Sequence, residues 1–173
     1  MVVMDANLSP ATLRTIFRLA GRYGVPVCAD PTTATLAPRL CPHLAGLALV
    51  TPNAPEAEVL CGMRVTGRES ALEAAQKLVG MGVEIAIVTL GATGLVYATS
   101  QESGHVPAAE VEIVDLTGAG DALTAAVVFG LLNDFPVDEA VRLGTSAAAL
   151  TLHSRETVCT DLSLERLYDQ LVI

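Results

Sequence analysis

Short apolar runs alternate with segments of helical periodicity along the first ninety residues. Four runs predict β-strands: VVMD (2–5), VPVCAD (25–30), GLALVTP (46–52) and EIAIVTL (84–90). Helices are predicted between them, over residues 10–23, 55–61 and 69–80. Apolar strands separated by helices are typical of a parallel sheet covered on both faces, so the pattern predicts an α/β fold.

The first predicted helix has clear start and stop signals. Ser9 is a typical N-cap residue, and Pro10 at the first helical position loses nothing by lacking an N–H group. The apolar residues of this segment recur at helical spacing: Leu13, Ile16, Phe17 and Ala20. Gly24 is expected to end the helix.

The pattern changes after residue 94. The segments GLVYAT, GHVPA and EVEIVD (110–115) are short pieces that suit a hairpin or meander at one edge of the sheet. Three further helices are predicted, over residues 118–133, 137–152 and 163–171. There is no internal repeat or linker, so residues 1–173 are expected to form one compact domain.

Composition and charge exclude several classes of protein. Apolar residues make up 51% of the chain, but Gly, Pro or charge interrupts every stretch before it could span a membrane. The N-terminus lacks the basic region of a signal peptide, so a cytoplasmic protein is expected. The net charge of −9 disfavours nucleic acid as a partner. The four cysteines form no CxxC pair, and reduced, mostly buried thiols are expected.

The turns that follow the predicted strands are rich in acidic, amide and glycine residues. In open α/β sheets ligands bind at the carboxyl ends of the strands. The turns of interest are DANLS, ADPTT, TPNAPEAE, TLGATG and DLTGAGD. A ligand site is therefore expected at this end of the sheet.

The stretch DLTGAGD (115–121) has the composition of an anion site. Gly118, Ala119 and Gly120 leave the backbone N–H groups of a helix N-terminus open to a phosphate. Asp121 would lie beside the bound anion, where a carboxylate can accept a proton from an attacking hydroxyl. The alternative is that the two glycines only permit close packing and that Asp121 stabilises the helix N-terminus.

The same stretch, in the form DLTGAGDA, resembles the second signature of the PfkB or ribokinase-like family of carbohydrate and nucleoside kinases. TPNAPEAEVL is similar to the NxxE segment of that family, and VTLGATG resembles the turn that borders its nucleotide site. The resemblance covers essentially the whole chain but only the C-terminal part of such kinases. It implies a ribokinase-like three-layer sandwich with a mostly parallel sheet, here without the N-terminal strands and the lid.

The resemblance also implies roles for individual residues. Asp121 would be the catalytic base, and the segment Gly118, Ala119 and Gly120 would form the anion hole for the transferred phosphoryl group. Asn53 and Glu56 would organise the water shell of Mg²⁺, although their spacing fits an ordinary helix capping box equally well.

Further residues are implied on the nucleotide side. Thr89, Gly91 and Gly94 would approach the phosphates and ribose of ATP, the alternative being a plain turn between strands. Asp115 and Thr117 match positions where several family members hold a monovalent cation, which makes K⁺ a candidate ion.

Other phosphate and metal motifs fail on inspection. The segment GMRVTGRE (62–69) has Arg68 and Glu69 where a Walker A loop needs Lys and Ser or Thr. GATG lacks the first half of a dinucleotide fingerprint. The three histidines are not spaced as metal ligands, so they are expected to be structural or exposed: His43, His105 and His153.

The expected activity is ATP-dependent transfer of a phosphoryl group to a hydroxyl of a sugar or nucleoside. DANLSP, ADPTT and AALTLHSRETV resemble the pseudouridine kinase branch most, so pseudouridine is the favoured acceptor. The alternative is a truncated, non-catalytic nucleotide-binding or interaction module of the same fold. The first predicted strand would expose an unpaired edge, and self-association through that edge is expected.

Overall fold

A computed structural model describes residues 1–154 and 156–171 of the chain. It divides into two compact units, which we name the sheet unit and the helical unit. The sheet unit comprises Met1–Leu90 and Val96–His105, and the helical unit comprises Gly91–Leu95 and Val106–Ile173. The prediction of a single kinase domain over residues 1–173 stays a prediction.

The strands form one sheet with the order β1-β2-β3-β4-β5-β6, and their bounds are β1 (Val2–Asp5), β2 (Val27–Asp30), β3 (Leu49–Val50), β4 (Ile85–Thr89), β5 (Leu95–Ala98) and β6 (Ser103–Val106). The first four strands pair in parallel, with Asp5 opposite Asp30 at the carboxyl ends of β1 and β2. The connections 90–94 and 99–102 are too short for a parallel crossover, so β5 and β6 run antiparallel to their neighbours. The sheet is therefore mixed, and the α/β fold is confirmed.

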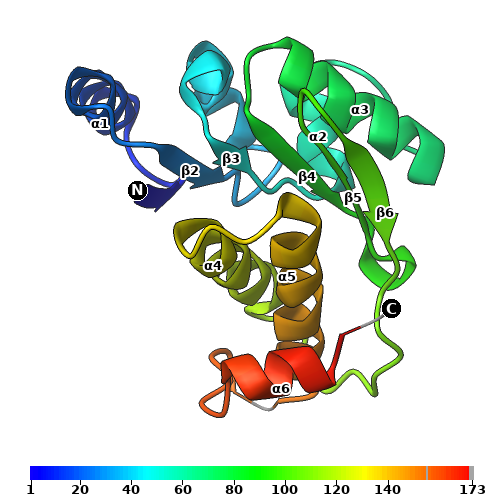
Figure 1. Ribbon diagram of the computed structural model, residues 1–173. Helices are drawn as coiled ribbons and strands as arrows, with labels where there is room; N and C mark the ends of the chain where they lie inside the picture. Colours follow the sequence, from blue (N-terminus) through cyan, green and yellow to red (C-terminus); the bar gives the residue numbers. More distant parts are fainter. Residues whose placement is uncertain (155, 172–173) are drawn as a thin grey trace. The chain divides into compact units, whose positions relative to one another are not determined.

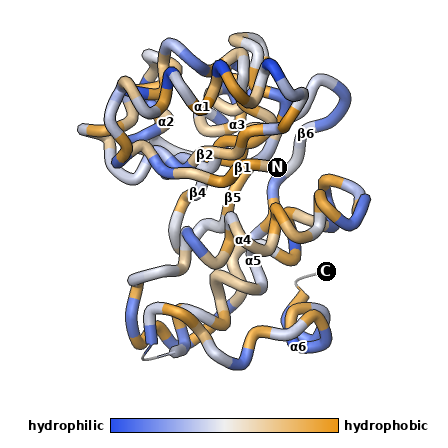
Figure 2. Tube along the Cα trace, turned by 90° about the vertical axis from the view of Figure 1, so that its left-hand side faces the viewer, coloured by the Kyte–Doolittle hydropathy of each residue, from blue (hydrophilic) through white to orange (hydrophobic). Residues whose placement is uncertain are grey.

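Three helices and two 3₁₀ helices complete the sheet unit: α1 (Pro10–Tyr23), α2 (Ala54–Cys61), α3 (Arg68–Gly80), η1 (Ala37–Arg39) and η2 (Cys41–Gly46). Figure 1 shows α2 and α3 beside the central strands. Buried residues of all three helices pack in one core with alternate residues of the strands. Strands β2, β4 and β5 are rich in hydrophobic residues, as expected of strands that need cover on both faces, whereas β6 is not (Figure 2).

Helix α1 begins and ends as its caps predict. The Ser9 side chain accepts a hydrogen bond from the Thr12 N–H at 3.1 Å, and Pro10 is the first helical residue. Gly24 has a φ of 63° and donates its N–H to the Ala20 carbonyl. Both terminal signals are confirmed, and the exposed positions of the helix carry its arginines.

The helical unit contains η3 (Gly91–Thr93), α4 (Ala119–Leu132), α5 (Val137–Leu152) and α6 (Leu164–Asp169). A small core joins α4, α5 and α6, built from Ala126, Leu143, Ala147 and Leu167. The Tyr168 hydroxyl donates to the Glu139 carboxylate and ties α6 to α5.

The prediction of a strand within residues 110–115 is wrong. This segment has no regular structure, because its N–H groups bond to the end of a helix instead of a neighbouring strand. The Val114 and Asp115 N–H groups both donate to the Leu152 carbonyl, at 2.8 and 3.3 Å. The segment therefore joins the C-terminal end of α5 and leads directly into the start of α4.

The cysteines are all free thiols, as expected. Cys28 and Cys61 are buried, Cys159 is half-buried and Cys41 is exposed, so burial is less general than predicted. Burial raises the pKa of the Cys28 thiol to about 11, which keeps it protonated and unreactive. Among the described residues no helix is long and apolar enough to cross a membrane.

Candidate active site

Asn53 and Glu56 form a complete capping box at the start of α2. The Asn53 side chain accepts from the Glu56 N–H at 3.0 Å, and Glu56 Oε2 accepts from the Asn53 N–H at 2.9 Å. The Asn53 amide nitrogen also donates to Glu56 Oε1 at 2.8 Å. Asn53 and Glu56 therefore do form the helix capping box that their spacing allows. Both residues also follow the carboxyl end of β3, where ligands bind in open α/β sheets, so the capping role does not exclude a role in metal binding.

The Glu56 carboxylate is buried without a compensating cation. The residue is 4% exposed, and it forms no ion pair with any side chain in the described ranges. Burial raises its pKa, and the charge of Asp30 raises it further, against the hydrogen bonds from Asn53 that lower it. A buried anion beside a second anion is a place where a cation would be favourable.

Asp30 is a site residue that the sequence reasoning did not single out. Asp30 is the last residue of β2. Its Oδ2 atom lies 3.4 Å from the hydroxyl of Thr51, a buried residue that directly follows β3. Burial is the main cause that raises the pKa of Glu56, and the charge of Asp30 adds to it. The available signal was its place in the turn ADPTT, at the end of a strand next to β3.

Thr89 lies beside Asn53, as predicted for a common site. The two residues form an isolated parallel bridge between the last residue of β4 and a residue beyond the end of β3. The Thr89 N–H donates to the Pro52 carbonyl at 2.9 Å. The sheet unit thus brings three of the predicted residues together, along with Asp30: Asn53, Glu56 and Thr89.

The turn after β4 contains the other two residues predicted for the nucleotide side. Gly91 and Gly94 have φ values of 57° and 92°, which favour glycine. A Cβ at Gly94 would lie 2.6 Å from the Ala108 nitrogen and would collide with the Val106 carbonyl. No atom lies within 4 Å of a Cβ placed at Gly91, so that side of the turn is open.

The start of α4 has the geometry that the glycine motif predicts. Gly118 is its N-cap, with a φ of 86° and no side chain to cap the helix, and a Cβ there would collide with the Thr157 carbonyl. A Cβ at Gly120 would meet no atom within 4 Å. The first N–H groups of any α-helix lack intrahelical partners, and the space beside Gly120 is open, so an anion site at this helix start stays a prediction.

Asp121 stands in the first turn of α4 and is exposed. Within residues 1–154 and 156–171 its carboxylate has no hydrogen bond or ion pair, so it is available to a ligand. Three residues before the glycines, the Asp115 carboxylate accepts the Thr117 N–H at 2.8 Å, and this bond lowers the pKa of Asp115.

The residues of the sheet unit fit magnesium better than a softer metal. Their donors are carboxylate, amide and hydroxyl oxygens, which Mg²⁺ prefers. No group of three or more His, Cys, Asp or Glu in the described part of the chain could hold a metal ion directly. Mg²⁺ usually keeps several of its water molecules, and a water-mediated site at Asn53 and Glu56 stays a prediction.

The histidines are structural where the structure reports their contacts. His43 stacks on Phe17, with ring centroids 4.4 Å apart, and His153 Nδ1 lies 3.2 Å from the Glu112 carbonyl oxygen. His43 also lines a groove of about 470 Å³ with Pro26, Ala48 and Glu84, residues that precede β2, β3 and β4. This groove lies at the amino ends of the strands, at the opposite end of the sheet unit from Asn53, Glu56 and Thr89.

Comparison with known proteins identifies relatives along nearly the whole chain. The chain is 35% identical to the ribokinase of Haemophilus influenzae over 136 residues, which cover 78% of this chain and 44% of that protein. It is 30% identical to the pseudouridine kinase of Escherichia coli over 165 residues, covering 95% and 52%. The chain therefore spans about half the length of these relatives.

A solved structure confirms the fold. The ribokinase of Arabidopsis thaliana complexed with ribose and ATP superposes with a TM-score of 0.85 at 23% sequence identity. The match covers 99% of this chain and 55% of that one. The family described as pfkB family carbohydrate kinase matches residues 2–161, and the chain belongs to that family.

Proposed function

We propose that this chain is the nucleotide-binding, C-terminal part of a kinase that transfers the γ-phosphoryl group of ATP to a hydroxyl of a sugar or nucleoside. The observation that carries the proposal is the start of α4. Its first N–H groups lack intrahelical partners, which suits an anion, and the Asp121 carboxylate, without an ion pair among the described residues, stands in the same helical turn. Residues 1–173 act in this proposal as part of one kinase domain.

Asp121 is the catalytic base of the proposed reaction. It takes the proton of the acceptor hydroxyl as the oxygen attacks the γ-phosphorus, and the bond from that phosphorus to the bridging oxygen of ADP breaks. The N–H groups of Gly118, Ala119 and Gly120 form the anion hole that stabilises the negative charge on the transferred group. The absence of an ion pair at Asp121 in the described residues supports this role.

Thr89, Gly91 and Gly94 bind the nucleotide in this proposal. The open approach to the Gly91 backbone supports a close contact with phosphate or ribose. The neighbour from Arabidopsis thaliana, solved with ribose and ATP, supports ATP as the phosphoryl donor.

Asn53 and Glu56 orient the water molecules of Mg²⁺, which supplies neutralising charge to the phosphates when bound. The buried charge of Glu56 supports a cation nearby. Asp115 and Thr117 are the proposed ligands of a monovalent cation such as K⁺, and the lowered pKa of Asp115 keeps that carboxylate charged for the task.

Pseudouridine is the favoured acceptor, and ribose is the competing one. The pseudouridine kinase of Escherichia coli matches more of the chain, while the ribokinase of Haemophilus influenzae is more similar in sequence. We place the protein in the cytoplasm, in keeping with its expected substrates. The unpaired edge of β1 supports self-association as a further property.

A phosphotransfer assay tests the proposal. The chain is incubated with ATP, Mg²⁺ and either pseudouridine or ribose, alone and together with the N-terminal half of a pfkB family kinase. We expect turnover only in the complemented sample. Nucleotide binding without turnover under every condition would instead identify a non-catalytic nucleotide-binding module, and the absence of any nucleotide binding would contradict both functions.

A further inference from the structure

The guanidinium group of Arg39 holds the turn that follows β1. Arg39 is the last residue of η1, and its Nη1 atom donates to the carbonyl oxygens of Ala6, Asn7 and Leu8 at 3.2, 3.4 and 3.1 Å. In the described ranges Arg39 forms no salt bridge. Its charged donor is therefore directed at the backbone of a single turn, where charge-assisted hydrogen bonds are strong.

This turn is bonded in its own right to the turn that follows β2. The Ala6 N–H donates to the Asp30 carbonyl at 2.9 Å and approaches the Thr32 hydroxyl at 3.2 Å. The Thr32 N–H in turn donates to Asp30 Oδ1 at 2.6 Å. A continuous set of hydrogen bonds thus runs from Arg39 to the Asp30 carboxylate.

Thr32 adopts a backbone conformation that a β-branched residue avoids. Its φ is 67°, in the left-handed region, which is unfavourable for a β-branched side chain. Such a conformation persists only where the surroundings impose it, and here both the N–H and the hydroxyl of Thr32 are engaged. The strain lies directly beside the carboxylate that the turn presents.

We propose that Arg39 is a positioning residue of the candidate active site, which acts through the Ala6–Leu8 turn and Thr32 to fix the Asp30 carboxylate. Asp30 Oδ1 is held by Thr32 and Oδ2 is approached by the Thr51 hydroxyl, so the orientation of the carboxylate is set from both sides. Its charge acts on Glu56, the residue proposed to orient magnesium-bound water. The effect on magnesium rests on the proposed function, whereas the effect on Asp30 does not.

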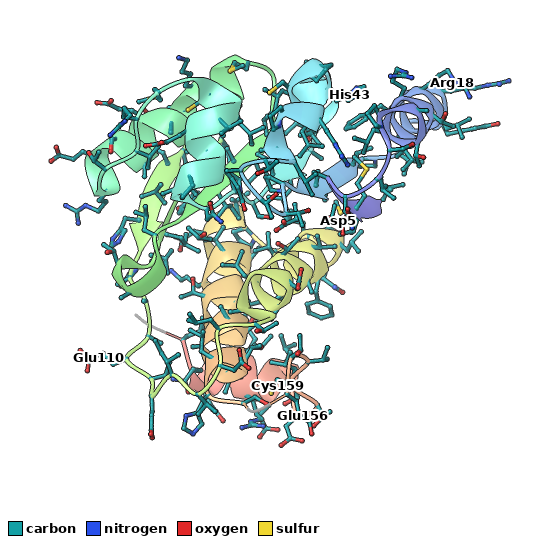
Figure 3. All side chains as sticks on the ribbon, turned by 180° about the vertical axis from the view of Figure 1, so that it is seen from behind. Asp5, Arg18, His43, Glu110, Glu156 and Cys159 are labelled. Carbon is teal, nitrogen blue, oxygen red and sulfur yellow. The ribbon has the colours of Figure 1, made fainter. Side chains whose placement is uncertain are left out.

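The first experiment measures hydrogen exchange of the Ala6 and Thr32 amides in the full chain. Arg39→Met removes the donor but keeps an unbranched apolar side chain of similar reach, and we expect both amides to exchange at least about tenfold faster. Arg39→Lys keeps three N–H donors and should restore slow exchange. Arg18→Met is the matched control, because Arg18 is exposed on α1 (Figure 3). Unchanged exchange in Arg39→Met would overturn the inference.

The second experiment titrates the chain with Mg²⁺ alone and follows the side-chain amide signal of Asn53 by NMR. Arg39→Met should raise the Mg²⁺ concentration at half-saturation about tenfold, as loss of a residue that orients ligands typically does. Thr32→Gly tolerates the left-handed backbone but loses the hydroxyl, so it should act in the same direction without lowering the melting temperature. If Arg39→Met fails to fold, the Mg²⁺ titration of Thr32→Gly tests the inference instead, and an unchanged Mg²⁺ concentration at half-saturation would overturn it.

Glu56→Gln separates the two proposals. If it raises the Mg²⁺ requirement while Arg39→Met and Thr32→Gly do not, Arg39 is a structural residue and the inference is overturned. If Glu56→Gln has no effect on Mg²⁺, the proposed magnesium role fails, and the exchange of the Thr32 amide alone decides whether Arg39 fixes Asp30.

Discussion

Glu56 affects the free energy of folding in two opposite ways: it caps a helix, which is stabilising, and it buries a carboxylate, which is destabilising when the group is charged. Its hydrogen bonds with Asn53 stabilise the start of α2, and a capping residue of this kind contributes about 0.5–2 kcal/mol. Its burial and the nearby charge of Asp30 disfavour the ionised carboxylate. The balance between the two terms therefore depends on pH.

Glu56→Gln should remove this pH dependence. Because the pKa of Glu56 is higher in the folded than in the unfolded chain, its contribution to stability is full below the unfolded value of about 4.3. That contribution is lost as the pH rises through the folded value. The free energy of unfolding of the Gln variant, relative to the wild type, should thus increase between pH 4 and pH 7. Urea denaturation across this range measures it, and a constant difference would contradict the raised pKa.

Asp121→Asn tests the proposed base. The amide has the same size but cannot accept the proton of the hydroxyl, so turnover in the complemented phosphotransfer assay should fall at least about 100-fold. ATP affinity and melting temperature should stay nearly unchanged. Asp134→Asn is a suitable control, because Asp134 is exposed and its φ of 59° is one that asparagine tolerates. A variant of Asp121 with normal turnover would exclude it from the mechanism.

At the scale of elements, the start of α4 depends on two glycines with different constraints. Gly118 needs its left-handed φ and its close approach to Thr157, whereas Gly120 has neither constraint. Stability and anion access are therefore separable by substituting one glycine at a time.

Gly118→Ala should destabilise the protein, and Gly120→Ala should not. Alanine at Gly118 is strained by about 1–3 kcal/mol, which corresponds to a fall of several degrees in melting temperature. At Gly120, inside the helix, alanine should leave the melting temperature equal or slightly higher while its methyl group weakens ATP binding. Thermal denaturation and a nucleotide titration of both variants measure the two effects. Equal melting temperatures for the two variants would contradict this assignment.

Elements with local signals were predictable from the sequence, and those without them were not. Helix α1 has the predicted bounds because Ser9, Pro10 and Gly24 act within one turn of the helix. Helix α5 has the predicted bounds as well, although no side chain caps its start. The strand predicted over 46–52 is only Leu49–Val50. The 3₁₀ helix η2 takes up Gly46 at one end of the predicted range, and the hydrophobic pattern gave no sign of that helix.

The same distinction holds for the site. Asn53 and Glu56 are three residues apart, so their pairing follows from the sequence. The influence of Asp30 on Glu56 depends instead on β2 and β3 being neighbours, and a single sequence does not give the order of strands. The contacts of Arg39 with a turn more than thirty residues away were unpredictable for the same reason.

At the scale of the whole molecule, β1 is an edge strand of four residues, and one of its sides pairs with no other strand in the described part of the chain. Val3 is 54% exposed. Edges of this kind pair readily with another chain unless a charge or a cover blocks them. The net charge of −9 opposes close association of copies, and raising the salt concentration would weaken that opposition.

Val3→Lys should reduce self-association, because a charge on an edge strand disfavours pairing with another strand. Sedimentation velocity at increasing protein concentration should show larger species for the wild type and mainly monomer for the variant. Val59→Lys on α2 is the control, since it adds the same charge at another exposed apolar residue. A wild-type chain that stays monomeric at every concentration would contradict the expected pairing.

The chain alone should bind ATP or ADP in the micromolar to millimolar range and should not phosphorylate pseudouridine or ribose. The residues proposed for the nucleotide all lie within it, but no segment of it is assigned to gripping the acceptor. Loss of that positioning removes roughly 7–11 kcal/mol of barrier reduction. Calorimetry and the phosphotransfer assay on the chain alone measure both properties, and ordinary turnover by a monomer would contradict them.

The tight turn at Gly94 has a consequence for how the gene can vary. Every amino acid reached from a glycine codon by a single base change carries a Cβ atom, and a Cβ here would collide with the backbone of Val106 and Ala108. No single base change that replaces the amino acid is therefore neutral at this position, and only synonymous changes are. Mutations can change the side chains around the turn, but the path of the backbone at Gly94 should stay the same.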